Sequence, residues 1–248
     1  MSAVVRIAMW SGPRNISTAL MRSFENRPDT AVVDEPFYAV YLNATGADHP
    51  MREDVLRAQS SDWRTVVAHL TSSMPEGRTV FYQKHMTHHM VAGIDLGWTR
   101  EMRNVFLIRA PEDVLLSYAA VRGAPSLTDI GVPQQMDLFE READRLGHAP
   151  LVVEASDVVK NPRGMLRALC AAVGISFSES MLSWPAGRRA TDGVWAPAWY
   201  GAVERSTGFA PPRKGARPED LPDDLRAIAE RARPSYERLA AHRLRAAR

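Results

Sequence analysis

The chain has 248 residues, of which 45% are hydrophobic and 24% are charged, a composition typical of a folded globular protein rather than a disordered one. Its formal net charge is only +2, so charge gives no reason to expect nucleic acid as a partner. The single cysteine, Cys170, excludes an intrachain disulfide and any metal site built from several cysteines. We interpret Cys170 as a core residue, because its neighbours are apolar.

No stretch approaches the roughly 20 apolar residues that span a bilayer, so we expect no integral membrane segment. The first ten residues are interrupted by Arg6 and lack the layout of a signal peptide. We therefore expect a cytoplasmic location.

The elements are predicted in chain order from apolar runs and their spacing. A β-branched run at 4–10 predicts a strand, and helical spacing at 19–25 is followed by a second strand at 30–34. Residues 43–61 are polar and are expected to be irregular, before a helix at 62–70 that Asp62 caps. Three further strands are predicted at 78–83, 104–109 and 150–154. One further helix is predicted to begin at Pro111, and three more are predicted at 134–146, 162–173 and 222–241.

Strands that alternate with helices, each strand a short apolar run, are typical of a parallel sheet covered on both faces. We therefore predict an α/β fold, a three-layer sandwich around a central, mostly parallel sheet of about five strands. No internal repeat, low-complexity tract or linker divides the sequence, so residues 1–248 are predicted to form a single domain.

Polar and ionisable residues follow four of the five predicted strands. They are residues 11–18 after the first strand, Asp34 and Glu35 after the second, Lys84 and His85 after the third, and Arg109 after the fourth. In open α/β sheets, ligands bind beyond the carboxyl ends of the strands. The sequence therefore predicts one site, suited to an anionic substrate.

The loop after the first strand has the character of an anion-binding site. It comprises Ser11, Gly12, Pro13, Arg14, Asn15, Ile16, Ser17 and Thr18. Gly12 allows a sharp turn, the following helix N-terminus offers free N–H groups to a phosphate or sulfate, and Arg14 adds a positive fork. The loop is not a Walker A motif, which needs a second glycine and a lysine. Alternatively, Ser17 or Thr18 simply caps the helix.

Two segments resemble the nucleotide-binding signatures of the sulfotransferase family. Residues 11–20, SGPRNISTAL, resemble the 5′-phosphosulfate loop, and residues 104–118, NVFLIRAPEDVLLSY, resemble the second signature. The resemblance covers roughly residues 3–170. It implies a fold like that of the P-loop nucleoside triphosphate hydrolases and a bacterial-type enzyme that uses 3′-phosphoadenosine-5′-phosphosulfate (PAPS).

The resemblance also implies roles for particular residues. Residues 11–18 bind the 5′-phosphosulfate, Arg14 stabilises the leaving oxygen, and Arg109 and Ser117 hold the 3′-phosphate. The sequence departs from the family in its first loop, because many cytosolic sulfotransferases carry lysine where Arg14 stands.

A distal Arg-Lys-Gly element often completes the 3′-phosphate site in the family. Arg213, Lys214 and Gly215 match its letters, but the residues that follow them do not match. The segment is therefore either a ligand of the 3′-phosphate or an exposed loop, and the sequence leaves the choice open.

Sulfuryl transfer needs a base that accepts the proton of the acceptor hydroxyl. Glu35 matches the position of a carboxylate base proposed for some bacterial carbohydrate sulfotransferases. His85, with Lys84, resembles the Lys-x-His segment of cytosolic sulfotransferases, although no residue separates the pair here. The sequence does not decide between the two bases, and Lys84 could instead offset charge on the phosphosulfate.

The predicted function is transfer of a sulfuryl group from PAPS to a hydroxyl or amine of a small-molecule, lipid or carbohydrate acceptor. We expect no metal and no nucleic-acid partner, and homo-oligomerisation is left open. A small-molecule kinase of the P-loop type and a non-catalytic nucleotide-binding protein remain the alternatives.

Two other groups of residues allow more than one interpretation. His85, His88 and His89 would share one face of a short helix and could hold zinc, but no cysteine supports such a site. The aromatic residues of a later stretch either anchor a loop to the core or cover the acceptor pocket. They are Trp184, Trp195, Trp199 and Tyr200.

Overall fold

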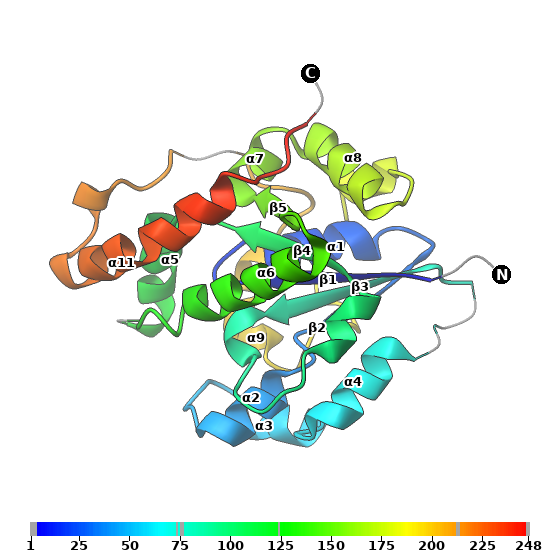
Figure 1. Cartoon of the computed structure of the whole chain (residues 1–248), viewed down its shortest axis with the longest axis horizontal. Helices are drawn as coiled ribbons and strands as arrows, with labels where there is room; N and C mark the ends of the chain where they lie inside the picture. Colours follow the sequence, from blue (N-terminus) through cyan, green and yellow to red (C-terminus); the bar gives the residue numbers. More distant parts are fainter. Residues whose placement is uncertain (1–3, 73, 75–76, 124, 212–213, 247–248) are drawn as a thin grey trace.

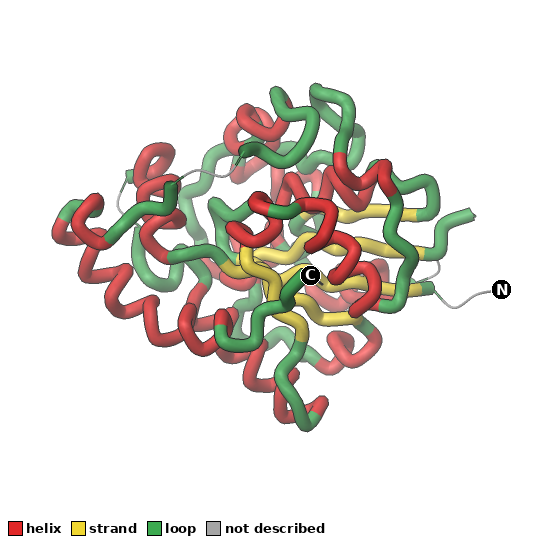
Figure 2. The backbone as a smooth tube through the Cα atoms, turned by 90° about the horizontal axis from the view of Figure 1, so that it is seen from above, coloured by secondary structure: helices red, strands yellow, loops and turns green. Residues whose placement is uncertain are grey.

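The fold is an open α/β sandwich built on a five-stranded parallel sheet, seen in a computed structural model that describes residues 4–72, 74, 77–123, 125–211 and 214–246. The sheet order is β2-β3-β1-β4-β5, and every neighbouring pair is parallel. The strands are β1 (Val5–Ser11), β2 (Thr30–Asp34), β3 (Val80–Met86), β4 (Arg103–Ile108) and β5 (Leu151–Glu154). In Figure 2 they lie side by side with helices around them.

Helices cover both faces of the sheet. Successive strand residues point to opposite faces, and apolar side chains on each face pack against helices. Ile7 and Met9 of β1 pack on one face with α1 (Ser17–Glu25) and α8 (Pro162–Val173). Trp10 packs on the other face with α4 (Trp63–Thr71), α6 (Val132–Leu146) and α11 (Asp223–Ala240). Figure 1 shows α8 and α4 on opposite sides of the sheet.

The remaining helices are short or lie at the ends of strands. They are α2 (Tyr38–Thr45), α3 (Arg52–Ala58), α5 (Pro111–Arg122), α7 (Ala155–Lys160), α9 (Ala196–Trp199) and α10 (Gly201–Glu204), with 3₁₀ turns η1 (Thr87–His89), η2 (Gly97–Glu101), η3 (Glu179–Leu182) and η4 (Pro218–Asp220). Helix α2 packs against the segment around α9 through Tyr38 and Trp195.

The structure confirms the predicted α/β class, the three layers and the five strands. Cys170 is fully buried, as expected of a core residue, and the Asp62 side chain accepts a hydrogen bond from Arg64 N as the cap of α4. The expectation that residues 43–61 are irregular is wrong, because α3 lies within them. Only Val55 of α3 is buried, so the helix carries no apolar stripe that a sequence pattern could reveal.

Candidate active site

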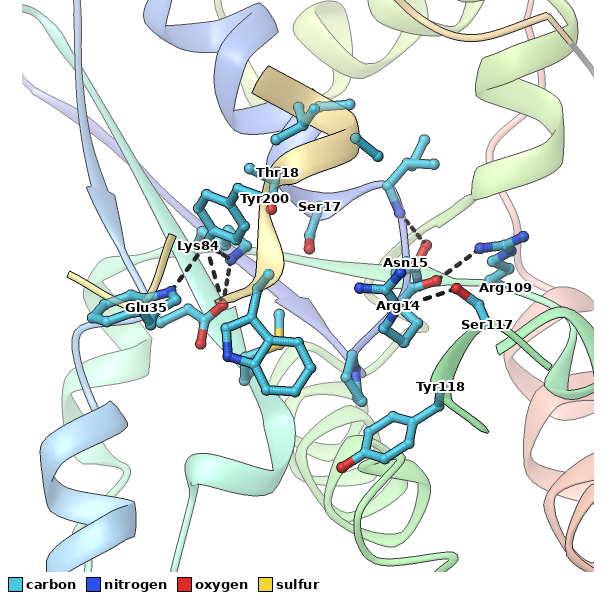
Figure 3. A pocket seen from close by; sticks show the side chains of 18 of the residues that line it. Arg14, Asn15, Ser17, Thr18, Glu35, Lys84, Arg109, Ser117, Tyr118 and Tyr200 are labelled. Carbon is cyan, nitrogen blue, oxygen red and sulfur yellow. Dashed lines mark hydrogen bonds and ion pairs between the residues drawn. The ribbon is translucent and has the colours of Figure 1, made fainter. Parts of the chain in front are cut away.

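One cavity of about 300 Å³ opens at the carboxyl edge of the sheet, where the loops after β1, β2, β3 and β4 meet. Its lining includes Arg14, Glu35, Lys84, Arg109 and Ser117, which the sequence placed at this edge. Figure 3 shows Arg14, Arg109 and Ser117 on one side of the cavity and Glu35 and Lys84 on the other, with Ser17 between them. The predicted residues therefore form two groups within a single cavity.

The loop after β1 lines the cavity from Pro13 to Thr18. Neither Ser17 nor Thr18 caps α1, because Ile16 is the N-cap and makes no side-chain cap hydrogen bond. The simple capping interpretation is therefore wrong, and both residues line the cavity at the first turn of the helix, whose N–H groups have no partner within the helix.

Ser11, the last residue of β1, and Gly12 are absent from the cavity lining. Gly12 is packed so closely that a Cβ atom built on it would meet Ile130 O at 2.3 Å. Its role is therefore to let the backbone of a second loop approach, and a larger residue would push the anion-binding loop out of place.

A pair of arginines forms the first group. Arg14 Nε donates a hydrogen bond to Ser117 Oγ at 3.1 Å, and Arg109 Nη1 donates to Arg14 O at 2.8 Å. Burial, together with the nearby positive charge of Arg109, lowers the pKa of Arg14 from its ordinary value. Two like charges held together in a cavity are stabilised by an anion, so this corner is suited to phosphate or sulfate.

A buried network around Lys84 forms the second group. Lys84 Nζ donates to Asp34 Oδ1 at 2.9 Å, to Glu35 Oε1 at 2.5 Å and to Tyr200 Oη at 2.8 Å. Tyr200 Oη in turn donates to Asp34 Oδ2 at 2.7 Å. The ammonium group thus has three oxygen partners, and the network holds two carboxylates, one ammonium and one phenol out of water.

The charges of this network shift one another's proton affinities. Burial raises the pKa of Glu35; the Lys84 ammonium opposes this and Asp34 adds to it, and the net shift is upward. Burial disfavours the Lys84 charge, but the attraction of Asp34 and Glu35 outweighs it, so the pKa of Lys84 lies well above its ordinary value. Glu35 is therefore a buried carboxylate whose proton affinity is increased, as a general base requires.

The backbone of both groups is strained at the residues that face the cavity. Positive φ angles occur at Arg14 (56°) and Glu35 (40°), and among the described non-glycine residues only Met51 shares this feature. Glu35 also precedes Pro36, where extended conformations are favoured. Such strain persists where the surroundings impose it, and it often marks functional residues.

His85 lies on the opposite face of β3 from Lys84, because alternate strand residues face opposite ways. It is buried, stacks on Trp10 with ring centroids 4.4 Å apart and does not line the cavity. Burial lowers its pKa to about 3. The residue that shares the face of Lys84 two positions later is Met86, which does line the cavity. The structure therefore brings Glu35, and not His85, to the site.

The proposed histidine zinc site does not form. His85 belongs to β3, whereas His88 and His89 lie in η1, so the three rings are not on one helical face. Within the described ranges, no three His, Cys, Asp or Glu side chains come together as metal ligands. No helix in the same part of the chain is both long and apolar enough to cross a membrane.

Of the aromatic residues between Trp184 and Tyr200, one anchors a loop to the core and three line the cavity. Trp184 anchors a loop, since it is buried and donates a hydrogen bond to Ser206 Oγ at 3.1 Å. Trp195, Trp199 and Tyr200 line the cavity. The hydrogen bond of Tyr200 to Asp34 joins residues 166 positions apart, and the sequence carried no signal for it beyond the aromatic enrichment.

Of the distal Arg-Lys-Gly element, Arg213 lies outside the described residues. Lys214 and Gly215 are exposed and are not part of the cavity lining.

Comparison with known proteins agrees with this geometry. The family model described as "Sulfotransferase domain" matches residues 5–243, so the chain belongs to the sulfotransferase domain family. The chain is similar to a sulfotransferase domain from the olefin synthase of Synechococcus PCC 7002, with a TM-score of 0.56, 18% identity and coverage of 93% of this chain and 95% of that one. A sulfotransferase from Alicyclobacillus acidocaldarius gives a TM-score of 0.55 at 13% identity, covering 97% and 96%. At these identities the likeness concerns the fold, which is P-loop-like.

Two curated relatives from Arabidopsis thaliana are named branched-chain-amino-acid aminotransferase-like proteins 1 and 2. They are 36% and 33% identical to this chain over 236 residues, which is 95% of its length. The chain spans only 42% and 41% of these relatives, so their names describe proteins more than twice as long.

Proposed function

We propose that the protein transfers a sulfuryl group from PAPS to a hydroxyl or amine of an acceptor molecule. The observation that carries this proposal is the presence, in one cavity, of an arginine corner suited to phosphate and a buried carboxylate suited to take a proton. Membership of the sulfotransferase domain family supports the reaction class.

The residues present fit the donor. The first turn of α1 offers its N–H groups and the hydroxyls of Ser17 and Thr18 to the 5′-phosphosulfate, and Gly12 lets the backbone of Ile130 pack closely against the loop. Arg109 and Ser117 are assigned to the 3′-phosphate. Arg14, which is hydrogen bonded to Ser117, supplies positive charge to the phosphate that becomes the leaving group.

Glu35 is assigned the role of general base. It accepts the proton of the acceptor hydroxyl while the acceptor oxygen forms a bond to sulfur and the bond between sulfur and the 5′-phosphate oxygen breaks. The electron pair of that bond remains on the phosphate, and adenosine 3′,5′-bisphosphate leaves. The Lys84 ammonium favours the ionised form of Glu35 against the effect of burial, and Asp34 and Tyr200 hold Lys84 in place. No metal takes part in these steps.

Calorimetric titration with adenosine 3′,5′-bisphosphate tests the donor assignment. We expect tight binding that is unchanged by a metal chelator, and much weaker binding of ATP with or without magnesium. Binding of ATP that depends on magnesium, with none of the bisphosphate, would favour a kinase instead. Binding of the bisphosphate by a protein that transfers sulfate to no acceptor would favour a non-catalytic role.

A further inference from the structure

The part of the cavity beside Glu35 has a different chemical character from the part beside Arg14. Its walls are aromatic and imidazole rings from three separate segments, namely Tyr38, His49, His88, His89, Trp195 and Trp199. The rings support one another: His89 stacks on Tyr38 with centroids 4.6 Å apart, and Tyr38 meets Trp195 edge to face at 5.1 Å. A preformed wall of this kind favours a ligand that contains a ring.

The lysine at the end of the cavity beside Glu35 is already paired with carboxylates. The lysine and arginine side chains of the described cavity lining are those of Arg14, Arg109 and Lys84, and Figure 3 places the two arginines on the far side from Glu35. Lys84 is bound by Asp34, Glu35 and Tyr200. An anionic group on the acceptor would therefore find no available counter-charge.

The two buried histidines of this wall do not supply that charge, and the third, His49, is already engaged through Nδ1 with Tyr38 Oη at 2.8 Å. His88 and His89 are more than nine-tenths buried, and the Nδ1 atom of each has no hydrogen-bond partner in the described part of the chain. A protonated imidazole carries a donor on both nitrogens, so protonation here would bury an unpaired donor on a charged ring. In accordance with this, burial lowers the pKa of His88 to about 3 and that of His89 well below its ordinary value.

We propose that the acceptor is a ring-bearing hydroxyl compound without an anionic group and that this end of the cavity excludes acceptors with a carboxylate, sulfate or phosphate group. The inference rests on the proposed function, because the donor would bring further negative charge into the same cavity and repel an anionic acceptor. Asp34 and Glu35 add two carboxylates at this end against the single ammonium of Lys84, and they repel an anionic group in the same way.

Two probes with the same phenolic ring test the proposal, namely 4-hydroxybenzyl alcohol and 4-hydroxybenzoate. Each is titrated into the protein saturated with adenosine 3′,5′-bisphosphate, and quenching of tryptophan fluorescence is followed. We expect the neutral alcohol to bind at least about tenfold more tightly than 4-hydroxybenzoate, because burying an unpaired charge is costly. Equal or tighter binding of 4-hydroxybenzoate, or binding of neither probe, overturns the proposal.

A charge-introducing variant makes the test sharper. In His88→Arg, a permanent cation lines the same wall, and we expect the disadvantage of 4-hydroxybenzoate to shrink at least about tenfold. The matched control is His148→Arg, which makes the same change at an exposed position and should leave the ratio unchanged. An unchanged ratio in His88→Arg that still binds the bisphosphate contradicts the inference. If His88→Arg does not fold, the wild-type comparison still decides.

The proposed function and the proposed acceptor class are tested by different results. Failure of the wild-type protein to bind adenosine 3′,5′-bisphosphate contradicts the proposed function. Normal binding of the bisphosphate with no preference among the probes contradicts only the acceptor class.

Discussion

Replacing Lys84 with methionine removes the cation that two buried carboxylates share. The ammonium lies 2.9 Å from Asp34 and 2.5 Å from Glu35, and the lysine side chain is only 1% exposed. Methionine preserves most of the apolar stem but leaves both carboxylates without this partner. Removing one partner of a buried ion pair costs about 3–5 kcal/mol, so we expect Lys84→Met to lower the free energy of unfolding by that amount at about pH 7.

The assay is urea unfolding followed by far-ultraviolet circular dichroism, with Arg57→Met as the matched control. Arg57 also forms an ion pair at 2.5 Å, with Asp54, but its side chain is 69% exposed. Because exposed ion pairs contribute little, the control should change the free energy of unfolding by less than about 1 kcal/mol. The two variants therefore compare a buried and an exposed pair of the same length.

The pH dependence of the decrease in unfolding free energy in Lys84→Met identifies the cause of that decrease. In the wild-type protein the Lys84 charge lowers the pKa of Glu35, against the upward effects of burial and Asp34. Without Lys84 the folded-state pKa rises further above the unfolded value of about 4.3, so the folded variant gains protons as the pH falls. We expect the loss to be largest near neutral pH and to shrink toward about pH 5. A decrease in unfolding free energy below about 1 kcal/mol, or one independent of pH, would show that the buried carboxylates do not depend on the Lys84 charge.

Three further substitutions have definite expected outcomes. Gly12→Ala would place a Cβ atom 2.3 Å from Ile130 O, so we expect urea unfolding to show a loss of about 1–3 kcal/mol and calorimetry to show weaker bisphosphate binding. Arg109→Ala should weaken binding of adenosine 3′,5′-bisphosphate by about tenfold to hundredfold and leave AMP unaffected; an equal loss for both ligands would contradict its assignment to the 3′-phosphate. His85→Phe should leave turnover unchanged, because the ring lies outside the cavity; inactivity of a folded variant would restore His85 as the base.

The strands were predictable because each contains a short apolar run, and the run at 30–34 coincides with β2. The predicted end of the third strand at residue 83 was wrong, because β3 continues through Lys84 and His85 to Met86. The order of the strands in the sheet could not be predicted, because β1 pairs with β3 and β4 through contacts between distant segments of the chain. Helix α3 was missed for a related reason. It is short and buries only Val55, so its sequence has no amphipathic period.

The site was predictable where a strand delivers a side chain to the edge of the sheet, as with Arg109 and Glu35. The position of His85 also follows from the sequence once β3 is known to continue through it, because Lys84 and His85 must then face opposite ways. Tyr200 could not have been found in this way. Its partners Lys84 and Asp34 lie more than a hundred residues away in the chain, and only tertiary packing brings the phenol to them.

Transfer of labelled sulfur tests the proposed reaction most directly. The protein is incubated with sulfur-labelled PAPS, 4-hydroxybenzyl alcohol and a metal chelator, in parallel with Glu35→Gln. We predict label in the phenol, an equal amount of adenosine 3′,5′-bisphosphate, and a rate about 10²- to 10⁴-fold lower in Glu35→Gln, which still binds the bisphosphate. Label that remains in the donor would contradict the acceptor class. Label that appears only as inorganic sulfate, or a Glu35→Gln variant as active as the wild type, would contradict the proposed reaction.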